Sequence, residues 1–345
     1  MRVAVVLNKF DSGGIENMVV NYYRHMDRDA VQYDIYYNEK STIPQYDELK
    51  AMGAGLYPIP SYSKLFRYIR TLKKAFREKK YRIVHAQVNT MSVFALFAAK
   101  KAGVPVRICH AHARGNKSEG LRYLLKILLR PFSTKYATDL FACGDESGRW
   151  MFKNRDFMVV PNAIDPKVFS YDDKARRELR QELSIPDDAF VVGHVGRFIV
   201  EKNHEFLLKI KEWLPEAYLL LIGEGDLESK ITGDKVVKTG ARKDVNKLYS
   251  AMDVFCLPSI SEGLPVVVVE AQANGLECVV SKAVPEEANL GGLCYRSLEE
   301  SAEKWAESIR NGKRFSTEVP AKWNIESAAK ILENWYVARN GDTDK

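Results

Sequence analysis

Short apolar segments alternate with longer amphipathic segments along the whole chain, and this alternation constrains the fold more than any other feature of the sequence. Residues 3–7 are the first apolar run, and beyond a polar loop Ile15, Met18 and Tyr22 recur at helical spacing. An apolar strand followed by an amphipathic helix is the unit from which parallel sheets are built. The alternation therefore predicts an α/β protein.

The alternation occurs twice, which predicts two doubly wound, Rossmann-like domains that leave a ligand-binding cleft at the carboxyl ends of their strands. A polar segment that begins with a proline, residues 161–165, marks the crossing, so we place the domains at residues 1–163 and 164–324. A final helical run at 325–339 follows them. The other predicted strands are 33–37, 83–86, 106–110, 140–143, 190–195, 218–222, 236–239, 254–257 and 278–281.

The composition excludes several classes of protein. With 345 residues, of which 46% are hydrophobic, the chain can bury two cores of ordinary size. The first apolar run is too short for a signal peptide, and no apolar stretch reaches the roughly 18 residues that span a membrane, so we expect a cytoplasmic protein. The cysteines show no C-x-x-C spacing, and we expect buried, reduced thiols rather than disulfides or metal ligands. They are Cys109, Cys143, Cys256, Cys278 and Cys294.

A Gly-Leu-Pro turn follows the predicted strand at 254–257 and is preceded directly by a glutamate, Glu262. Proline suits the first position of a helix, because its missing N–H would have no partner there. If a helix starts at Pro265, the amides of Gly263 and Leu264 lie at its positive end and form a site for an anion. Glu262 then lies at the mouth of that site.

The four valines that follow, residues 266–269, suit a strand better than a helix when they are considered alone. However, the segment continues to Asn274 with Gly275 as a helix stop, and the next predicted strand comes only at 278–281. This order favours a helix. Glu270 would then lie one to two turns inside the helix, eight residues beyond the first glutamate.

A cationic loop follows the predicted strand at 190–195. Arg197 and Lys202 lie five residues apart in it, and a guanidinium and an ammonium group can hold a diphosphate from two sides. Taken alone, two such side chains are more often solvated surface cations. Their position after a strand, in the same predicted domain as Glu262, favours a diphosphate site.

The loop after the first strand contains two adjacent glycines, Gly13 and Gly14, which allow the backbone to approach a ligand phosphate closely. The alternative is the plain start of a helix. The loop lacks the G-x-G-x-x-G pattern, which argues against a nicotinamide-dependent dehydrogenase.

Two histidines close the predicted strand at 106–110. We expect His110 and His112 to point to opposite faces of the sheet, which makes them poor ligands for one metal ion. One of them should then face the cleft. A further loop, residues 240–245, contains Arg242; its alternative interpretation is an exposed turn in which Asp244 caps the next helix.

Together these motifs resemble the family 4 retaining glycosyltransferases, which have the GT-B fold and an E-x7-E motif that Glu262 and Glu270 match. The resemblance implies that residues 1–163 bind the acceptor and that residues 164–324 bind a nucleotide-sugar donor. It also implies that the last helix, within residues 325–345, packs back on the first domain.

The resemblance assigns roles to individual residues. It implies a catalytic set of His112, Arg197, Lys202 and Glu262. Glu262 can accept a hydrogen bond from a sugar hydroxyl, and Glu270 can accept both hydrogens of a ribose diol. The donor-binding residues that the resemblance implies are Gly13, Gly14, Arg242, Gly263, Leu264, Pro265 and Glu270.

The activity implied is transfer of a hexose from a nucleotide-diphosphate sugar, expected to be a UDP-sugar, with retention at the anomeric carbon. The acceptor would be a glycan or a polyprenyl-diphosphate-linked sugar in exopolysaccharide, capsule or cell-envelope synthesis. No cofactor and no metal ion is implied. Two alternatives stay open: a sugar-nucleotide epimerase of the same fold, and a non-catalytic protein that binds anions or nucleic acid.

Charge is distributed unevenly, because residues 1–165 sum to +12 and residues 166–345 to −5. The basic part lacks a nucleic-acid motif, so we expect no nucleic-acid partner. Residues 64–82 combine nine basic residues with an apolar stripe of Leu65, Phe66, Ile69, Leu72 and Phe76. Residues 121–135 place Arg122, Lys126 and Arg130 among leucines. We therefore expect peripheral contact with an anionic membrane; the alternative is that both stripes pack on the sheet.

Overall fold

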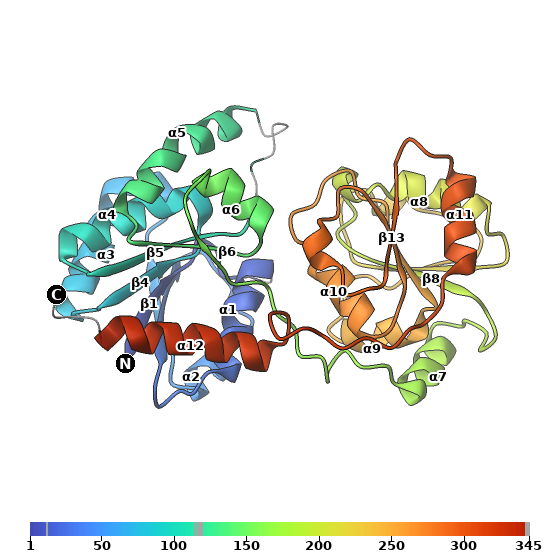
Figure 1. Ribbon diagram of the computed structural model, residues 1–345, viewed down its shortest axis with the longest axis horizontal. Helices are drawn as coiled ribbons and strands as arrows, with labels where there is room; N and C mark the ends of the chain where they lie inside the picture. The colour runs from blue at the N-terminus through green and yellow to red at the C-terminus, as the bar shows by residue number, and fades with distance from the viewer. Residues whose placement is uncertain (12, 114, 116–119, 342–345) are drawn as a thin grey trace. The chain divides into compact units, whose positions relative to one another are not determined.

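The structure is a computed structural model that describes residues 1–11, 13–113, 115 and 120–341. The chain divides into two compact units, each a parallel sheet flanked by helices (Figure 1). The first unit comprises Met1–Ala163 and Ala321–Lys345, and the second comprises Ile164–Pro320. The α/β, Rossmann-like fold class predicted from the alternation is confirmed.

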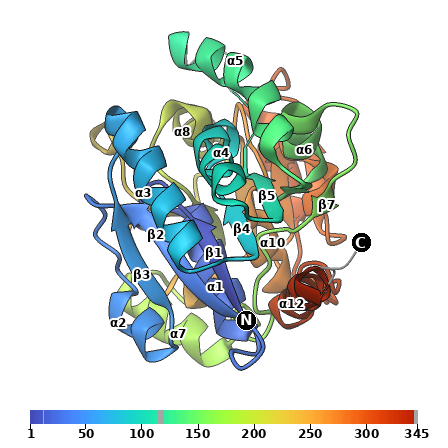
Figure 2. The ribbon, with the colours of Figure 1, turned by 90° about the vertical axis from the view of Figure 1, so that its left-hand side faces the viewer.

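The first unit contains a seven-stranded sheet in the order β3-β2-β1-β4-β5-β6-β7, with all neighbours parallel (Figure 2). Its strands are β1 (Arg2–Val6), β2 (Gln32–Asn38), β3 (Gly55–Ile59), β4 (Ile83–Ala86), β5 (Val106–Ala111), β6 (Asp139–Ala142) and β7 (Met158–Val159). Its helices are α1 (Gly14–His25), α2 (Tyr46–Ala51), α3 (Leu65–Glu78), α4 (Ser92–Ala102), α5 (Leu121–Tyr136), α6 (Asp145–Phe152) and α12 (Ile325–Gly341).

Two apolar layers enclose this sheet. One layer packs α1, α2 and α12 on one face, with Tyr22 and Tyr336 fully buried in it. The other packs α3, α4 and α6 on the opposite face. The last helix is therefore part of the core of the first unit, although the whole second unit lies between it and residues 1–163 in the sequence.

The second unit contains a six-stranded parallel sheet in the order β10-β9-β8-β11-β12-β13. Its strands are β8 (Val191–Val195), β9 (Tyr218–Ile222), β10 (Val236–Lys238), β11 (Val254–Leu257), β12 (Cys278–Ser281) and β13 (Leu293–Arg296). Its helices are α7 (Asp173–Glu182), α8 (His204–Glu212), α9 (Val245–Ala251), α10 (Val266–Ala273) and α11 (Ala302–Asn311).

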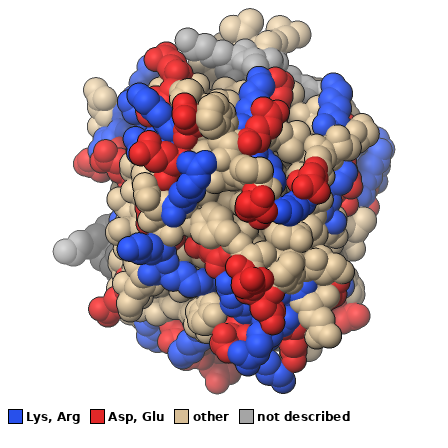
Figure 3. Space-filling model, turned by 90° about the vertical axis from the view of Figure 1, so that its right-hand side faces the viewer, with Lys and Arg blue, Asp and Glu red and all other residues tan. Residues whose placement is uncertain are grey.

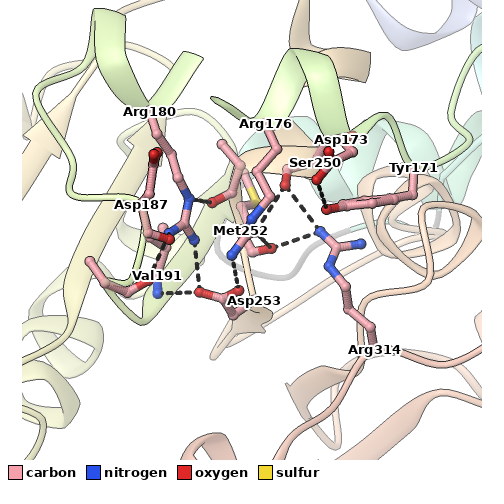
Figure 4. A network of polar contacts seen from close by, with 12 residues as sticks. Tyr171, Asp173, Arg176, Arg180, Asp187, Val191, Ser250, Met252, Asp253 and Arg314 are labelled. Carbon is pink, nitrogen blue, oxygen red and sulfur yellow. Dashed lines mark hydrogen bonds and ion pairs between the residues drawn. The ribbon is translucent and has the colours of Figure 1, made fainter. Parts of the chain in front are cut away.

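A network of arginines lies at the amino-terminal ends of the strands of this second sheet (Figure 4). Arg180 of α7 is fully buried, and it binds Asp253 at 2.9 Å and the carbonyl of Ala251 at 3.0 Å. Arg176 binds the other oxygen of Asp253 at 2.6 Å, and Arg314 binds the carbonyls of Tyr249 and Met252. The guanidinium groups thereby donate to carbonyls at the end of α9, where the last carbonyls of a helix lack the usual intrahelical partners.

Three strands, β3, β7 and β13, were not predicted from the sequence, and β3 shows the reason. It contains Pro58, which cannot donate to a neighbouring strand, and β3 lies at the edge of its sheet, where proline is tolerated. The two-residue β7 and the partly exposed β13 are also edge strands. The prediction that the cysteines are buried is confirmed for four of the five, and Cys294 is partly exposed.

The apolar stripe expected on α3 is partly wrong. Leu72 and Phe76 are buried, but the third fully buried residue of the helix is Tyr68. Phe66 instead lies on the outer side and is 90% exposed. Residues three or four positions apart share one side of a helix. Tyr68, Leu72 and Phe76 follow this spacing, whereas Phe66 lies two positions before Tyr68 and therefore on another side.

Helix α5 leaves most of its apolar side chains in solvent. Of its described side chains only that of Ser133 is fully buried. The exposed apolar residues are Leu121, Leu124, Leu125, Leu128 and Phe132, of which Leu121 is 82% exposed. In Figures 1 and 2 the first turns of α5 project away from the sheet.

Of the cations expected on α5 (Arg122, Lys126 and Arg130), at least Arg130 packs against the protein. Arg130 donates to the carbonyl of Trp150 at 2.7 Å and lies 5.5 Å from the centre of its ring, so it is a packing residue. The side chain of Arg122 lies outside the described part of the chain. Among the described helices, none has the length and apolar character needed to cross a bilayer.

Candidate active site

Two neighbouring strands of the second sheet, β8 and β11, bring the expected diphosphate residues together. The loops that leave their carboxyl ends are joined by two hydrogen bonds. The amide of Ile260 donates to the carbonyl of Glu201 at 2.8 Å, and the side-chain amide of Asn203 donates to the carbonyl of Pro258 at 3.1 Å. Because the two strands are adjacent, residues about 60 positions apart in sequence lie side by side.

Lys202 and Glu262 form an ion pair across these loops. The Nζ atom of Lys202 lies 2.6 Å from Oε1 of Glu262, and the two side chains are only 17% and 9% exposed. Arg197, on the same loop as Lys202, is exposed and has no side-chain partner among the described residues. The site thus combines one guanidinium that is open to a ligand with one ammonium that a carboxylate neutralises.

Helix α10 begins beside this pair. The valine run is helical, as the downstream stop signal predicted, and Gly275 ends it with a φ of +83°. The expected first residue is wrong by one, because Pro265 is the N-cap and the helix starts at Val266. Val268 and Val269 are buried, so packing against the sheet outweighs the weak helix propensity of valine. Gly263 and Leu264 precede the cap, with Gly263 exposed.

Glu270 faces α9 rather than the Lys202 pair. Its Oε2 atom accepts a hydrogen bond from the hydroxyl of Tyr249 at 2.7 Å. The surrounding protein raises the pKa of Glu270 to about 7, mainly because burial disfavours the carboxylate, although part of the side chain reaches the surface. The carboxyl group can therefore change its charge near neutral pH.

Arg242 has the surroundings of a surface ion-pair network. It binds both oxygens of Asp244 at 2.8 Å and one oxygen of Glu182, from α7, at 2.6 Å. Asp244 stands at the N-cap of α9 but makes no capping hydrogen bond, so the capping role considered for it is wrong. Its carboxylate orients Arg242 instead.

The first unit has a cavity of about 230 Å³ at the carboxyl ends of β1 and β4. Gly13 and Gly14 stand at the start of α1, and neither has a positive φ. The carboxylate of Glu16 folds back against Gly13. A side chain on Gly13 would overlap this carboxylate unless Glu16 turned away. The polar residues that line the cavity are Asn8, Lys9, Glu16, Tyr62, Gln87 and Asn89.

His112 lies just beyond the end of β5, and two residues that line the cavity hold it. Its amide donates to Oδ1 of Asn89 at 2.6 Å, and its Nε2 lies 2.6 Å from Oε1 of Gln87. A carbonyl oxygen only accepts, so Nε2 carries the proton and Nδ1 the lone pair. Burial lowers the pKa of His112 to about 3, so the ring is neutral at pH 7.

The expectation that His110 and His112 point to opposite faces is wrong. Residues i and i+2 of a strand lie on the same face, and the two rings stack with centres 4.1 Å apart. Behind them, Nδ1 of His110 lies 3.0 Å from Nε2 of His85, whose Nδ1 lies 2.6 Å from the hydroxyl of Tyr336. His110 is fully buried, as expected for a core residue. Within the described residues, no group of three potential ligands is placed to hold a metal ion.

Three features of the sites were missed from the sequence. Gln87 and Asn89 follow β4 directly, so the rule that placed ligands at strand ends could have found them. Gly223, after β9, has a φ of +140°, and a Cβ there would lie 2.0 Å from the carbonyl oxygen of Gly196. This glycine lets the two loops touch. Tyr249 carried no sequence signal.

Two family models match the chain. Residues 12–168 match the model described as Glycosyltransferase Family 4, and residues 189–311 match the model described as Glycosyl transferases group 1. EpsF of Bacillus subtilis strain 168, which is named as a glycosyltransferase, is 35% identical over 333 residues that cover 89% of this chain and 86% of EpsF. An Escherichia coli galactosyltransferase, named for UDP-Gal and a GlcNAc-diphosphoundecaprenol acceptor, is 27% identical over 61% of this chain and 60% of its own length.

Solved structures share the fold over nearly the whole chain. HepE of Anabaena in complex with UDP-glucose has a TM-score of 0.74 at 18% identity and covers 99% of both chains. WaaG, a glycosyltransferase involved in lipopolysaccharide biosynthesis, has a TM-score of 0.63 at 17% identity, covering 97% of this chain and 95% of its own. The two Rossmann-like units thus define a GT-B architecture. The chain belongs to glycosyltransferase family 4.

Proposed function

We propose that this protein transfers a hexose from a UDP-sugar to a lipid-linked or glycan acceptor, with retention of the anomeric configuration and without a metal ion. The observation that carries the proposal is the cluster of Arg197, Lys202 and Glu262 beside the start of α10. Family membership supports glycosyl transfer, and the cluster supports a nucleoside diphosphate as the leaving group.

The charges of the cluster suit the departure of a diphosphate. Negative charge grows on the phosphate oxygens as the glycosidic bond breaks, and fixed cations nearby stabilise that charge. Arg197 is open to solvent, and Lys202 exchanges Glu262 for the diphosphate when the donor binds. Glu262, once released, accepts a hydrogen bond from a sugar hydroxyl. These two cations take the place of a divalent metal under the diphosphate.

The remaining site residues divide between base, ribose and sugar. Glu270 accepts hydrogen bonds from the ribose diol, and Arg242, oriented by Asp244, lies along the base. Gly263 and Leu264 present backbone N–H groups to the diphosphate before α10, and Pro265, which has no N–H, is the N-cap of that helix. In the first unit, Nδ1 of neutral His112 is the acceptor for a hydroxyl of the transferred sugar, and Gly13 and Gly14 let the first loop approach the donor.

The acceptor binds to the first unit, where the polar cavity at the ends of β1 and β4 offers hydrogen-bond partners for sugar hydroxyls. The names of two relatives support a lipid-linked acceptor: the E. coli galactosyltransferase above and a Campylobacter jejuni enzyme named for a diphospho-undecaprenol substrate. A capsular polysaccharide enzyme of Staphylococcus aureus is also similar, at 26% identity over 64% of each chain. We place the reaction in the synthesis of a cell-surface polysaccharide.

A lipid-linked acceptor requires access to a membrane surface, and the exposed leucines of α5 support such contact. Helices α3, α4 and α5 lie side by side, and α3 adds Phe66 together with exposed Arg67 and Arg70. Apolar side chains that enter the headgroup region and cations that attract anionic lipid act together. The protein is proposed to bind the inner face of the membrane peripherally.

The purified protein should convert one UDP-sugar, from a panel of hexoses and N-acetylhexosamines, into a product on a diphosphoundecaprenol-linked monosaccharide. Mass spectrometry of the lipid detects the added hexose. A control with donor alone distinguishes the alternative enzyme class, because an epimerase changes the donor when no acceptor is present. Turnover of the donor alone, with no product on any acceptor, would reject the proposed transfer.

A further inference from the structure

Tyr249 of α9 holds the carboxyl group of Glu270 from the interior of the second unit. Its hydroxyl donates to Oε2 of Glu270 at 2.7 Å. The tyrosine is completely buried, and its ring lies against Phe255 of β11 and Phe169, with ring centres 6.0 and 6.1 Å away. Its carbonyl accepts a hydrogen bond from Arg314 at 3.1 Å. The phenol is therefore fixed before any ligand arrives.

The two oxygens of Glu270 differ in their surroundings. Oε2 is occupied by the tyrosine, whereas Oε1 has no hydrogen-bond partner among the described residues. Glu270 is also partly exposed, and Oε1 is not among the buried polar atoms that lack a partner. One oxygen is thus tied to the core and the other is available to a ligand.

We propose that Tyr249 is a positioning residue for nucleotide binding, which orients Glu270 so that Oε1 accepts the hydrogen bonds of the ribose diol. This inference rests on the proposed function, in which Glu270 binds the ribose. A glutamate on a helix has three rotatable side-chain bonds, and fixing it beforehand removes an entropic cost that ligand binding would otherwise carry.

The same hydrogen bond also affects the charge of Glu270. Burial raises the pKa of Glu270 to about 7, and the hydrogen bond from Tyr249 acts in the opposite direction because it favours the ionised form. Burial raises the pKa of Tyr249 well above its usual value, so the phenol stays a donor. Cys278 of β12 also faces this tyrosine, and burial raises its pKa, so it stays neutral.

The pH dependence of UDP binding follows from the charge of Glu270. Above pH 7 Glu270 is ionised and accepts strongly, so UDP binding should strengthen as the pH rises through about 7. Without the tyrosine hydroxyl, the pKa of Glu270 rises further, and the midpoint of the binding profile moves to higher pH. The loss of affinity should therefore be larger at pH 7 than at pH 9.

The test compares UDP binding to wild type, Tyr249→Phe and Glu270→Gln by calorimetry between pH 6 and 9. We expect Tyr249→Phe to weaken binding about fivefold at pH 7, to shift the midpoint upward and to have little further effect when combined with Glu270→Gln. Binding of 2′,3′-dideoxy-UDP should be insensitive to Tyr249→Phe, because that nucleotide lacks the diol. Tyr218→Phe, which removes a hydroxyl from β9, is the control.

The two variants distinguish the positioning role of Tyr249 from the ribose-binding role of Glu270. If Glu270→Gln binds UDP like wild type, the ribose role of Glu270 is wrong. If Glu270→Gln weakens binding but Tyr249→Phe changes neither affinity nor midpoint, the positioning role is overturned. Should Tyr249→Phe fail to fold, Glu270→Asp tests the same idea, since the shorter side chain cannot reach both partners. Full affinity in Glu270→Asp would refute the positioning.

Discussion

Lys202 is the residue whose surroundings say most about the proposed reaction. Its ammonium group lies 2.6 Å from Glu262, on loops that leave two adjacent strands. An ion pair with side chains this little exposed costs desolvation, so the pair contributes less stability than its short distance suggests. In the proposed reaction, the pair keeps a cation in place until a diphosphate displaces the carboxylate.

Replacing the cations should lower the rate of the chemical step. Arg197→Ala and Lys202→Ala are each expected to reduce turnover about 10²-fold or more at saturating donor, because they act on charge that grows toward the transition state. Steady-state kinetics with separate kcat and KM values measures this. Lys209→Ala is the matched control, because Lys209 pairs with Glu205 on the outer side of α8. Wild-type turnover in both variants would remove the cations from the mechanism.

Single residues also mark the limit of what the sequence could predict. Arg197, Lys202 and Glu262 could be grouped because each follows a strand, and strand ends of a parallel sheet meet at one edge. The partner of Glu270 could not be found in this way, since Tyr249 lies inside a helix with no distinguishing neighbours. The two histidines were misplaced because the alternation of side chains along a strand was applied with the wrong period.

Among the helices and strands, packing determined the secondary structure of segments for which intrinsic propensity gave no clear prediction. The four valines are helical because α10 buries Val268 and Val269 between its neighbours, although valine prefers strands. Conversely, β3 is a strand although it contains a proline, because an edge strand has a side without partners. Strands in the middle of the sheets were predictable, since apolar runs that are buried on both faces give a strong signal.

The arginine network predicts a large stability effect at one residue of α7. Arg180→Met removes the donors to Asp253 and to four backbone carbonyls, those of Ala251, Pro186, Asp187 and Ala189. We expect the free energy of unfolding to fall by about 3 kcal/mol, because buried acceptors are left without partners.

Denaturant unfolding monitored by circular dichroism measures this loss. The control is Arg177→Met on the same helix, whose exposed pair with Asp173 should contribute less than about 0.5 kcal/mol. Equal stability of Arg180→Met and Arg177→Met would show that the network does not hold the sheet edge.

At the scale of the whole molecule, charge divides between the two units. The excess of positive charge lies in residues 1–165, which sum to +12. Figure 3, which looks onto the second unit, shows acidic and basic side chains interspersed. The exposed leucines of α5 belong to the basic unit, and this combination is typical of proteins that bind anionic membranes.

Membrane contact predicts that two kinds of change weaken vesicle binding. Leu124→Asn with Leu128→Asn removes apolar surface, and Arg67→Glu with Arg70→Glu reverses charge; each pair should weaken binding to anionic vesicles about tenfold or more. Cosedimentation at low and high salt measures this. Val337→Asn, an exposed residue of α12, is the control. Equal binding of wild type to neutral and anionic vesicles would instead favour a soluble acceptor.

The proposed reaction is a retaining transfer in which side-chain cations replace a metal ion. The most direct measurement is the configuration of the new glycosidic bond, determined by NMR on product formed in excess chelator. The proposal predicts that product forms at an undiminished rate and that its anomeric carbon keeps the configuration of the donor. A product of inverted configuration, or activity that chelator abolishes and manganese restores, would contradict it.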